Sequence, residues 1–379
     1  MAESRDHSRV AVLADLLTAR PTSRRDIADR TSLSAATVSR VVEGLLSDGI
    51  VREIAEEVTD SRGRRAVLID LVAERTHTVG IDLGAHTTRI SLGNAVGEPI
   101  AYASHATPGE LPAAELARWL LARMRELADA TGVEPATLAV GVPGAVSSDR
   151  SVSNAPNLPQ VEDAAFAAEL EIVFGAPVDL DNDVNLALLG EQRSGAARGK
   201  PSAAMLSIGA GLGAALAIDG RILRGRHGLV GEFGQLPIGP FGARLEHMVT
   251  GPGILRRAQE AGTALSTPQE LFDGSARVAG LRAQFDAALG VVLTAIAVSS
   301  EPEIIVLGGG IAASIADSIP RYRDELAASL RVAPELRLAE LGDRSGAIGA
   351  MIAALRTSCT RDLGLPPTVL DDFPRAPLG

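Results

Sequence analysis

Apolar positions in the first 72 residues repeat first with helical spacing and then in two short runs. One apolar face of a first helix is formed by Val10, Leu13, Leu16 and Leu17. A later helix carries the stripe Val38, Val41, Val42, Leu45 and Leu46. Ser23 and Ser34 are predicted to cap the second and third helices. Gly49 ends the third helix, and the runs 50–54 and 66–71 predict a β-hairpin.

The third helix keeps a set of small and polar residues off its apolar stripe. Small side chains let a helix sit deep in a major groove, and polar ones can reach base edges or phosphates. The set is Ser34, Ala35, Thr37, Ser39 and Arg40. The hairpin tip carries Arg62, Arg64 and Arg65, which suit phosphate contacts or a narrow minor groove. Each part alone is commonly a solvated surface, but in this order they are typical of a winged helix-turn-helix that binds double-stranded DNA.

Beyond residue 78 the pattern changes to short apolar strands that end in glycine turns, alternating with longer amphipathic helices. The strands are predicted at 79–83, 89–93, 138–142, 178–181, 203–208, 214–218 and 304–307. Helices are predicted at 113–130, 186–192 and 280–298, and we expect the apolar face of the last to pack in the core rather than on a partner subunit. Two similar α/β halves predict two lobes with a cleft between them.

Composition and charge leave DNA binding feasible and argue against a disulfide-rich, thiolate-metal or membrane protein. The formal charge is −11, but residues 1–75 hold 12 Arg and 13 Asp or Glu, so the head is nearly neutral and a basic face for DNA remains feasible. The single cysteine, Cys359, excludes a disulfide framework or a multi-thiolate metal site within one chain. The N-terminus lacks a signal-peptide pattern, and we expect no membrane span and a cytoplasmic location.

Five motifs of the body, in this order, resemble the ROK family (repressors, uncharacterised reading frames and sugar kinases). They are Gly141-Val142-Pro143-Gly144, Asn154-Ala155-Pro156-Asn157-Leu158-Pro159, Asn182-Asp183-Val184-Asn185, Gly231-Glu232-Phe233-Gly234 and Leu307-Gly308-Gly309-Gly310. The resemblance covers about residues 78–356, and the head matches the family's repressor branch. It implies an actin-like, hexokinase-type, ribonuclease H-like ATPase fold. Lobe I would comprise 78–182 with about 345–360, and lobe II 183–344, after a DNA-binding domain at 1–72 and before a C-terminal tail at 361–379.

The resemblance also implies a sugar site. Asp183 occupies the place of the aspartate that deprotonates the sugar hydroxyl in the family's kinases, although Asn182 and Asp183 could instead simply cap a helix. By similarity, the polar ring around the sugar would be completed by Asn157, Asn182, Glu232, Gln235 and Glu246.

The chain departs from the family's kinases at both phosphate loops. Those kinases usually have Asp-x-Gly-Gly-Thr, whereas this chain has Asp82-Leu83-Gly84-Ala85-His86. Their Gly-Thr-Gly is here Gly209-Ala210-Gly211, whose glycines could persist only because a turn needs them. Loss of one essential donor typically costs about 2.7–4 kcal/mol of transition-state stabilisation. We therefore expect degenerate nucleotide loops, no catalytic residue and no use of ATP.

The family's zinc site is also expected to be absent. Members with structural zinc have a histidine where this chain has Gln235, followed by three cysteines, and none of those four ligands is present here. We therefore expect no metal and no cofactor. His247 lies nearby, but a single histidine is more often an ordinary polar contact.

Together these features predict a sugar-responsive transcription repressor that binds an inverted-repeat operator as a homodimer or homotetramer. One alternative is an active ATP-dependent sugar kinase with an appended DNA-binding domain. Another is a regulator whose pocket no longer binds sugar.

Overall fold

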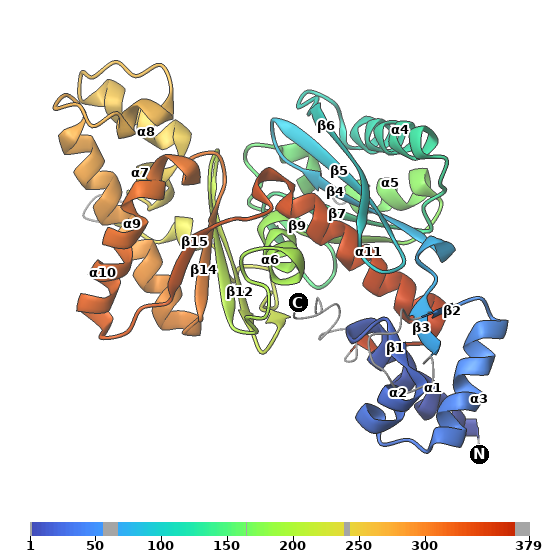
Figure 1. Cartoon of the computed structure of the whole chain (residues 1–379). Coiled ribbons are helices and arrows are strands. Elements are labelled where there is room, and N and C mark those ends of the chain that lie inside the picture. Colours follow the sequence, from blue (N-terminus) through green and yellow to red (C-terminus); the bar gives the residue numbers. More distant parts are fainter. Residues whose placement is uncertain (1, 56–66, 164, 239–242, 368–379) are drawn as a thin grey trace.

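The computed structural model describes residues 2–55, 67–163, 165–238 and 243–367. Figure 1 shows a small N-terminal head against one of two larger lobes, which we call lobe I, while lobe II lies on the other side of lobe I.

The head contains three helices and a three-stranded antiparallel sheet. The helices are α1 (Ala2–Thr18), α2 (Arg24–Thr31) and α3 (Ala35–Ser47). The strands are β1 (Thr22–Ser23), β2 (Val51–Ala55) and β3 (Val67–Leu71), in the order β1-β3-β2. The hydroxyls of Ser23 and Ser34 accept the N–H groups of Asp26 and Thr37, so both predicted caps are confirmed. Strand β1 was not predicted, because two residues are too few to show an alternating pattern.

Lobe I is built on a five-stranded sheet in the order β10-β7-β4-β5-β6. The strands are β4 (His77–Leu83), β5 (Thr87–Asn94), β6 (Pro99–Ala106), β7 (Thr137–Val142) and β10 (Val178–Asn182). Strands β4, β7 and β10 are parallel, so their carboxyl ends meet at one edge. Helices α4 (Ala113–Thr131) and α5 (Ala165–Phe174) cover one face, and β8 (Ala145–Val146) pairs with β9 (Val152–Ser153).

Lobe II repeats this strand arrangement in the order β15-β14-β11-β12-β13. The strands are β11 (Ala203–Ile208), β12 (Leu212–Ile218), β13 (Arg221–Ile222), β14 (Ile304–Gly308) and β15 (Glu335–Leu338). The helices are α7 (Glu246–Val249), α8 (Gly251–Glu260), α9 (Ala279–Ser300) and α10 (Ile319–Leu330). Two lobes that share one α/β topology confirm the predicted fold class of the body.

Helix α9 is a core helix of lobe II. Phe285, Leu289, Val292 and Ile296 are all buried against the lobe II sheet, as predicted. Among the described helices, α9 alone is long and apolar enough by length and composition to cross a membrane. Length and composition alone are weak evidence for a membrane span, because the buried core helix of a folded domain passes the same test.

Two helices lie between the lobes. Helix α6 (Asp183–Ser194) packs on the lobe II sheet through Val184 and Leu188 and on helix α11 (Ser345–Leu363) through Leu186 and Leu189. Helix α6 begins three residues before the predicted position, because Asn182 caps it by accepting the Val184 and Asn185 N–H groups.

The predicted tail boundary at 361 is wrong. Helix α11 continues to Leu363, and Leu365 is 1% exposed and packs in the same apolar cluster as the head. The sequence signal was missed because Leu363 and Leu365 stand beside glycine and prolines, which suggested the end of ordered structure.

Candidate functional site

A cavity of about 400 Å³ opens between the lobes at the carboxyl ends of the lobe I strands. Open α/β sheets bind ligands at this edge. Lobe I contributes Asp82, Gly84 and Arg89, lobe II contributes Ser207 and the glycine turn 308–310, and the two central helices contribute Asp183, Val184, Ser345 and Gly346. The predicted base position and both predicted phosphate-loop strands thus meet at one cleft.

Asp183 is held at the junction of β10 and α6. Its Oδ1 accepts the Val184 N–H at 2.8 Å and the Asn182 side-chain amide at 3.0 Å. The same amide of Asn182 donates to the Gly144 carbonyl at 2.9 Å. The capping role and the sugar-binding role predicted for this motif are therefore compatible. The hydrogen bonds at the start of α6 use Oδ1 of Asp183 and leave its second carboxylate oxygen, Oδ2, available to a ligand.

The pKa values of three acidic groups at this site, Asp183, Asp82 and Glu232, are raised, in each case mainly by burial. Burial, together with the charges of Asp82 and Glu232, raises the pKa of Asp183 to about 7, while the Val184 N–H acts in the opposite direction. Burial raises the pKa of Asp82 to about 6, although the Arg89 charge opposes it. Burial and then the charge of Glu246 raise the pKa of Glu232. Near neutral pH, Asp183 can consequently accept or donate a hydrogen bond to a sugar hydroxyl.

Lobe II reaches this site through residues 223–232, which follow β13. Arg224 donates from Nε and Nη2 to Asp181 Oδ2 at 2.9 and 2.7 Å, which ties lobe II to the end of β10. At Gly228, φ is +72°, and a Cβ there would lie 2.4 Å from the Val146 carbonyl oxygen of lobe I. These contacts bring Glu232 towards Asp183.

The remaining predicted sugar contacts divide into two groups. Glu246 lies near Glu232, since its charge contributes to the raised pKa of Glu232, and a Cβ at the neighbouring Gly234 would be 3.3 Å from the Cβ of Glu246. The side-chain oxygen of Gln235 accepts a hydrogen bond from Arg244 Nη1. Asn157 is exposed, and no contact within the described residues joins it to the acidic group. The structure therefore brings Asn182, Asp183, Glu232 and Glu246 together, and shows no such contact for Asn157 among the described residues.

Arg89 is a cation of the cleft that no motif in the sequence indicated. Arg89 is the cross-strand partner of Asp82 in the β4–β5 pair. Its guanidinium lies 3.8 Å from Asp82 Oδ2 and 3.3 Å from Asp343 Oδ2, just before α11. Pairing the predicted strands 79–83 and 89–93 as a hairpin, and counting back from the turn, could have found this partner.

The two glycine loops differ in what the fold requires of them. In the first loop, a Cβ at Gly84 would lie 2.8 Å from the Thr87 carbonyl oxygen, so packing explains that glycine. In the second loop, a Cβ at Gly211 would meet nothing within 4 Å, and one at Gly209 only the Gly310 nitrogen at 3.7 Å. Neither glycine has a positive φ. Neither space nor φ therefore requires a glycine at these two positions, whereas a Cβ at Gly213 would lie 2.9 Å from Val184 Cγ2.

Across the described residues, no three His, Cys, Asp or Glu side chains form a group that could hold a metal ion. Residues 239–242 of the loop after Gln235 lie outside the described part.

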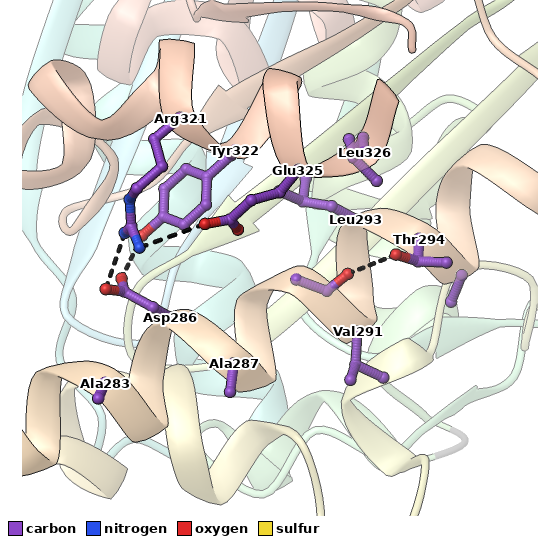
Figure 2. A pocket seen from close by; sticks show the side chains of 12 residues that line it. Ala283, Asp286, Ala287, Val291, Leu293, Thr294, Arg321, Tyr322, Glu325 and Leu326 are labelled. Carbon is purple, nitrogen blue, oxygen red and sulfur yellow. Dashed lines mark hydrogen bonds and ion pairs between the residues drawn. The ribbon is translucent and has the colours of Figure 1, made fainter. Parts of the chain in front are cut away.

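A larger hollow of about 700 Å³ lies between α9 and α10, far along the chain from the predicted site residues (Figure 2). Its charged groups satisfy one another: Asp286 binds Arg282 at 2.8 Å and Arg321 at 2.7 Å and accepts the Tyr322 hydroxyl. The Thr294 hydroxyl donates to the Gly290 carbonyl. With its acid neutralised internally, this hollow offers less to a polyhydroxyl ligand than the cleft does.

In the head, the predicted DNA-contacting residues lie together at the start of α3. Ser34, Ala35, Ala36 and Arg40 are exposed, and Thr37 and Ser39 are half-buried. No hydrogen bond or ion pair joins Arg40 to another described residue, whereas Arg24 and Arg25 pair with Glu53 and Asp29. Arg62, Arg64 and Arg65 lie outside the described residues.

The family model of the ROK family matches residues 78–357, which is most of the chain. The chain belongs to the ROK family. Among curated relatives, it is 35% identical over 220 residues to the bifunctional enzyme NanE/NanK of Brucella suis biovar 1, covering 56% of this chain and 41% of that protein. It is 28% identical over 228 residues to the DNA-binding transcriptional dual regulator NagC of Escherichia coli K12, covering 59% and 55%. The chain thus spans about half the length of these relatives.

Two solved structures of the family match different lengths of this chain. The ROK hexokinase from Thermus thermophilus covers 74% of this chain and 98% of its own, with a TM-score of 0.63 and 29% identity. A ROK family transcriptional regulator, a homologue of the E. coli MLC protein, covers 92% and 97% with a TM-score of 0.75 and 21% identity. The regulator's fold therefore extends over a part of the chain that the hexokinase's fold does not reach.

Proposed function

We propose that this protein is a cytoplasmic DNA-binding transcription regulator whose operator affinity is controlled by a sugar or sugar derivative in the interlobe cleft. The observation that carries the proposal is the combination of the acidic group around Asp183 with a head in which α3 presents an exposed Arg40 that no other described residue binds. The regulator-type fold over 92% of the chain supports the same combination.

On the DNA side, we propose that the head acts as a winged helix-turn-helix. The first turn of α3 would enter the major groove, where Ala35 and Ala36 allow close approach and Arg40 contacts a base edge or phosphate. The hairpin between β2 and β3 would contact the backbone through Arg62, Arg64 and Arg65. Two copies of the chain would place two heads on an inverted repeat, as closed symmetric dimers do.

On the effector side, we propose that sugar hydroxyls bind Asp183, Glu232 and Glu246, with Asn182 holding Asp183 in place. Gln235 would join them only if a ligand displaced its bond from Arg244. Because Glu232 and Glu246 come from lobe II and Asp183 from the start of α6, bound sugar would favour one closure of the lobes. We do not include Asn157 in this proposed site, because no contact in the described part of the chain joins it to the acidic group.

Residual sugar kinase activity is the second candidate function. It is favoured by Asp183, whose pKa of about 7 suits a general base, and by Gly209 and Gly211, which leave open space where a phosphate could approach. Against it, Arg89 lies beside Asp82, and Ala210 and His86 supply neither hydroxyl of the kinase loops. We propose that nucleotide and metal are not used, and ATP-dependent phosphorylation of any sugar in a monosaccharide and aminosugar panel would overturn this part.

The DNA half is tested by selecting duplexes from a random pool with the purified full chain. We expect the enriched sequences to contain two inverted half-sites about one helical turn, or a multiple of one, apart. Arg40→Ala should weaken binding to the selected duplex by about 1–3 kcal/mol. The matched control, Arg256→Ala on the exposed face of α8, should leave it unchanged. Selection of no sequence, or equal loss in both variants, would reject the proposed DNA interface.

A further inference from the structure

Helix α11 has its two ends in different parts of the molecule. Its first turn belongs to the cleft, where Ser345 and Gly346 line the cavity and a Cβ at Gly346 would lie 2.7 Å from Cγ of Asp82. Its last turns belong to the head, because Leu355 and Cys359, 1% and 4% exposed, share one apolar cluster with the head's Leu16 and Ile69. Nineteen helical residues span about 28 Å.

The middle of α11 is packed with backbone in contact with backbone. A Cβ at Gly80 on β4 would lie 2.0 Å from the Met351 nitrogen, and one at Gly349 would lie 1.7 Å from the Leu186 carbonyl oxygen on α6. The Thr78 and Thr137 hydroxyls donate to carbonyls of α11 at 3.3 and 3.0 Å. Because backbone atoms make these contacts, a displacement of α11 cannot be accommodated by side chains changing conformation. Helix α11 therefore moves as a rigid body or not at all.

A buried carboxylate joins the first turn of α11 to both chain crossings between the lobes. Glu191 on α6 is fully buried and accepts the Ser345 hydroxyl at 2.7 Å. It also accepts the N–H groups of Glu340 and Leu341, where the chain returns from lobe II, at 3.1 and 3.0 Å. A fourth bond, from the Ala196 N–H at 2.8 Å, comes from the segment where the chain leaves α6 for lobe II. Any rotation of lobe II therefore acts on the N-terminus of α11.

The head is held by this helix as well as by its covalent linker. Besides Leu355, Cys359 and Leu365, lobe I contributes Val96 to the head's cluster, and Arg20 of the head pairs with Glu98 of lobe I at 3.1 Å. At the junction, a cavity of about 30 Å³ is lined by residues that include Leu17, Ile50 and Leu71 of the head and Ser358 and Cys359 of α11. The contact between the head and α11 leaves little free space.

We propose that α11 transmits the state of the cleft to the head, with Glu191 as the positioning residue at the lobe crossing. The proposal rests on the proposed function for its purpose, since a change in head position would alter the fit of two heads to two half-sites. The transmission itself requires neither DNA nor sugar. A perturbation at Gly346 should change how readily the apolar core of the head opens to solvent.

The test is amide hydrogen exchange on the full chain without ligand, comparing wild type with Gly346→Ala. The added methyl group pushes on Asp82 at the cleft end of α11. We expect exchange in residues 355–363 of α11 and in the head's 10–18 and 35–47 to change by on the order of 10-fold, a typical magnitude for coupling between sites. Gly310→Ala is the matched control. It adds the same methyl group in the same cleft, but a Cβ at Gly310 would meet no atom within 4 Å. That variant should leave the head unchanged.

Ser345→Ala provides a milder second variant in case Gly346→Ala fails to fold, because it adds no atoms and removes only the hydroxyl that bonds Glu191 and the Gly342 carbonyl. A change confined to the cleft, with head exchange identical to wild type in both variants, overturns the proposal. Equal changes in the head for Gly310→Ala overturn it too. Because no DNA or sugar is present, these results are independent of whether the proposed function holds.

Discussion

Replacing Asp183 with asparagine should make the protein more stable, by an amount that grows with pH. The substitution keeps the shape and the Oδ1 acceptor that receives the Val184 N–H and the Asn182 amide. It removes only the charge. A carboxylate that weakens the fold is understandable where a ligand, rather than packing, requires it.

The magnitude follows from the raised pKa. The pKa of Asp183 rises from 3.8 to about 7, and each unit corresponds to about 1.4 kcal/mol. Because the folded-state pKa lies above the unfolded one, the stability contributed by the protonated form is complete below about pH 4. It is lost progressively as the pH rises to about 7. The full loss would be about 4 kcal/mol, and partial solvation of this half-buried group reduces it. We expect Asp183→Asn to gain about 1 kcal/mol at pH 5 and about 3 kcal/mol at pH 8.

Urea unfolding followed by fluorescence of the single tryptophan, Trp119, measures this gain, because Trp119 packs against the lobe I core. The free energies of unfolding of wild type and variant are compared at pH 5, 6.5 and 8. Asp324→Asn is the control, since its side chain is 70% exposed, and should show no gain at any pH. A gain that does not change with pH, or a loss of stability at pH 8, would refute the reasoning.

Three further predictions concern the head. Asp15→Asn should destabilise it by about 1–3 kcal/mol in thermal unfolding, because Asp15 is 8% exposed and receives two bonds from the half-exposed Arg30, and a stability within 0.5 kcal/mol of wild type would contradict this. Ser34→Ala should lose about 1 kcal/mol through the missing cap of α3, whereas Ser34→Gly should lose only a few tenths. Replacing the hairpin arginines with alanine should lower the salt dependence of DNA binding by about 0.9 in log–log slope per lost phosphate contact, and an unchanged slope would show that they do not touch the backbone. These residues are Arg62, Arg64 and Arg65.

Local signals explain what the sequence could predict. The cap at Ser34 and the stripe through Val38 and Val42 depend on residues within one or two turns of each other, so the helices of the head were predictable. The same holds for the core face of α9, whose apolar residues recur at helical spacing. In the structure, Asp82 and Asp183 meet at one cleft because β4, β7 and β10 are parallel and end at the same edge.

Features that depend on tertiary contact were not predictable in this way. The Glu191 carboxylate is satisfied by residues about 150 positions away, and nothing near it in the sequence marks it as buried. Leu355 and Leu365 complete a core that begins at Val12, across almost the whole chain. Asn157 fits its motif by similarity, yet its position at an exposed turn depends on how the segment around Asn154 folds.

Operator binding by the full chain with and without sugar tests the central claim most directly. Fluorescence anisotropy with the selected duplex would be recorded across monosaccharides, aminosugars, disaccharides and sugar phosphates, for wild type and Asp183→Ala. We predict that at least one sugar changes the Kd of wild type for DNA by about 5- to 150-fold. In Asp183→Ala, DNA binding without sugar should persist and the sugar response should vanish. A sugar response of full size in Asp183→Ala would contradict the account.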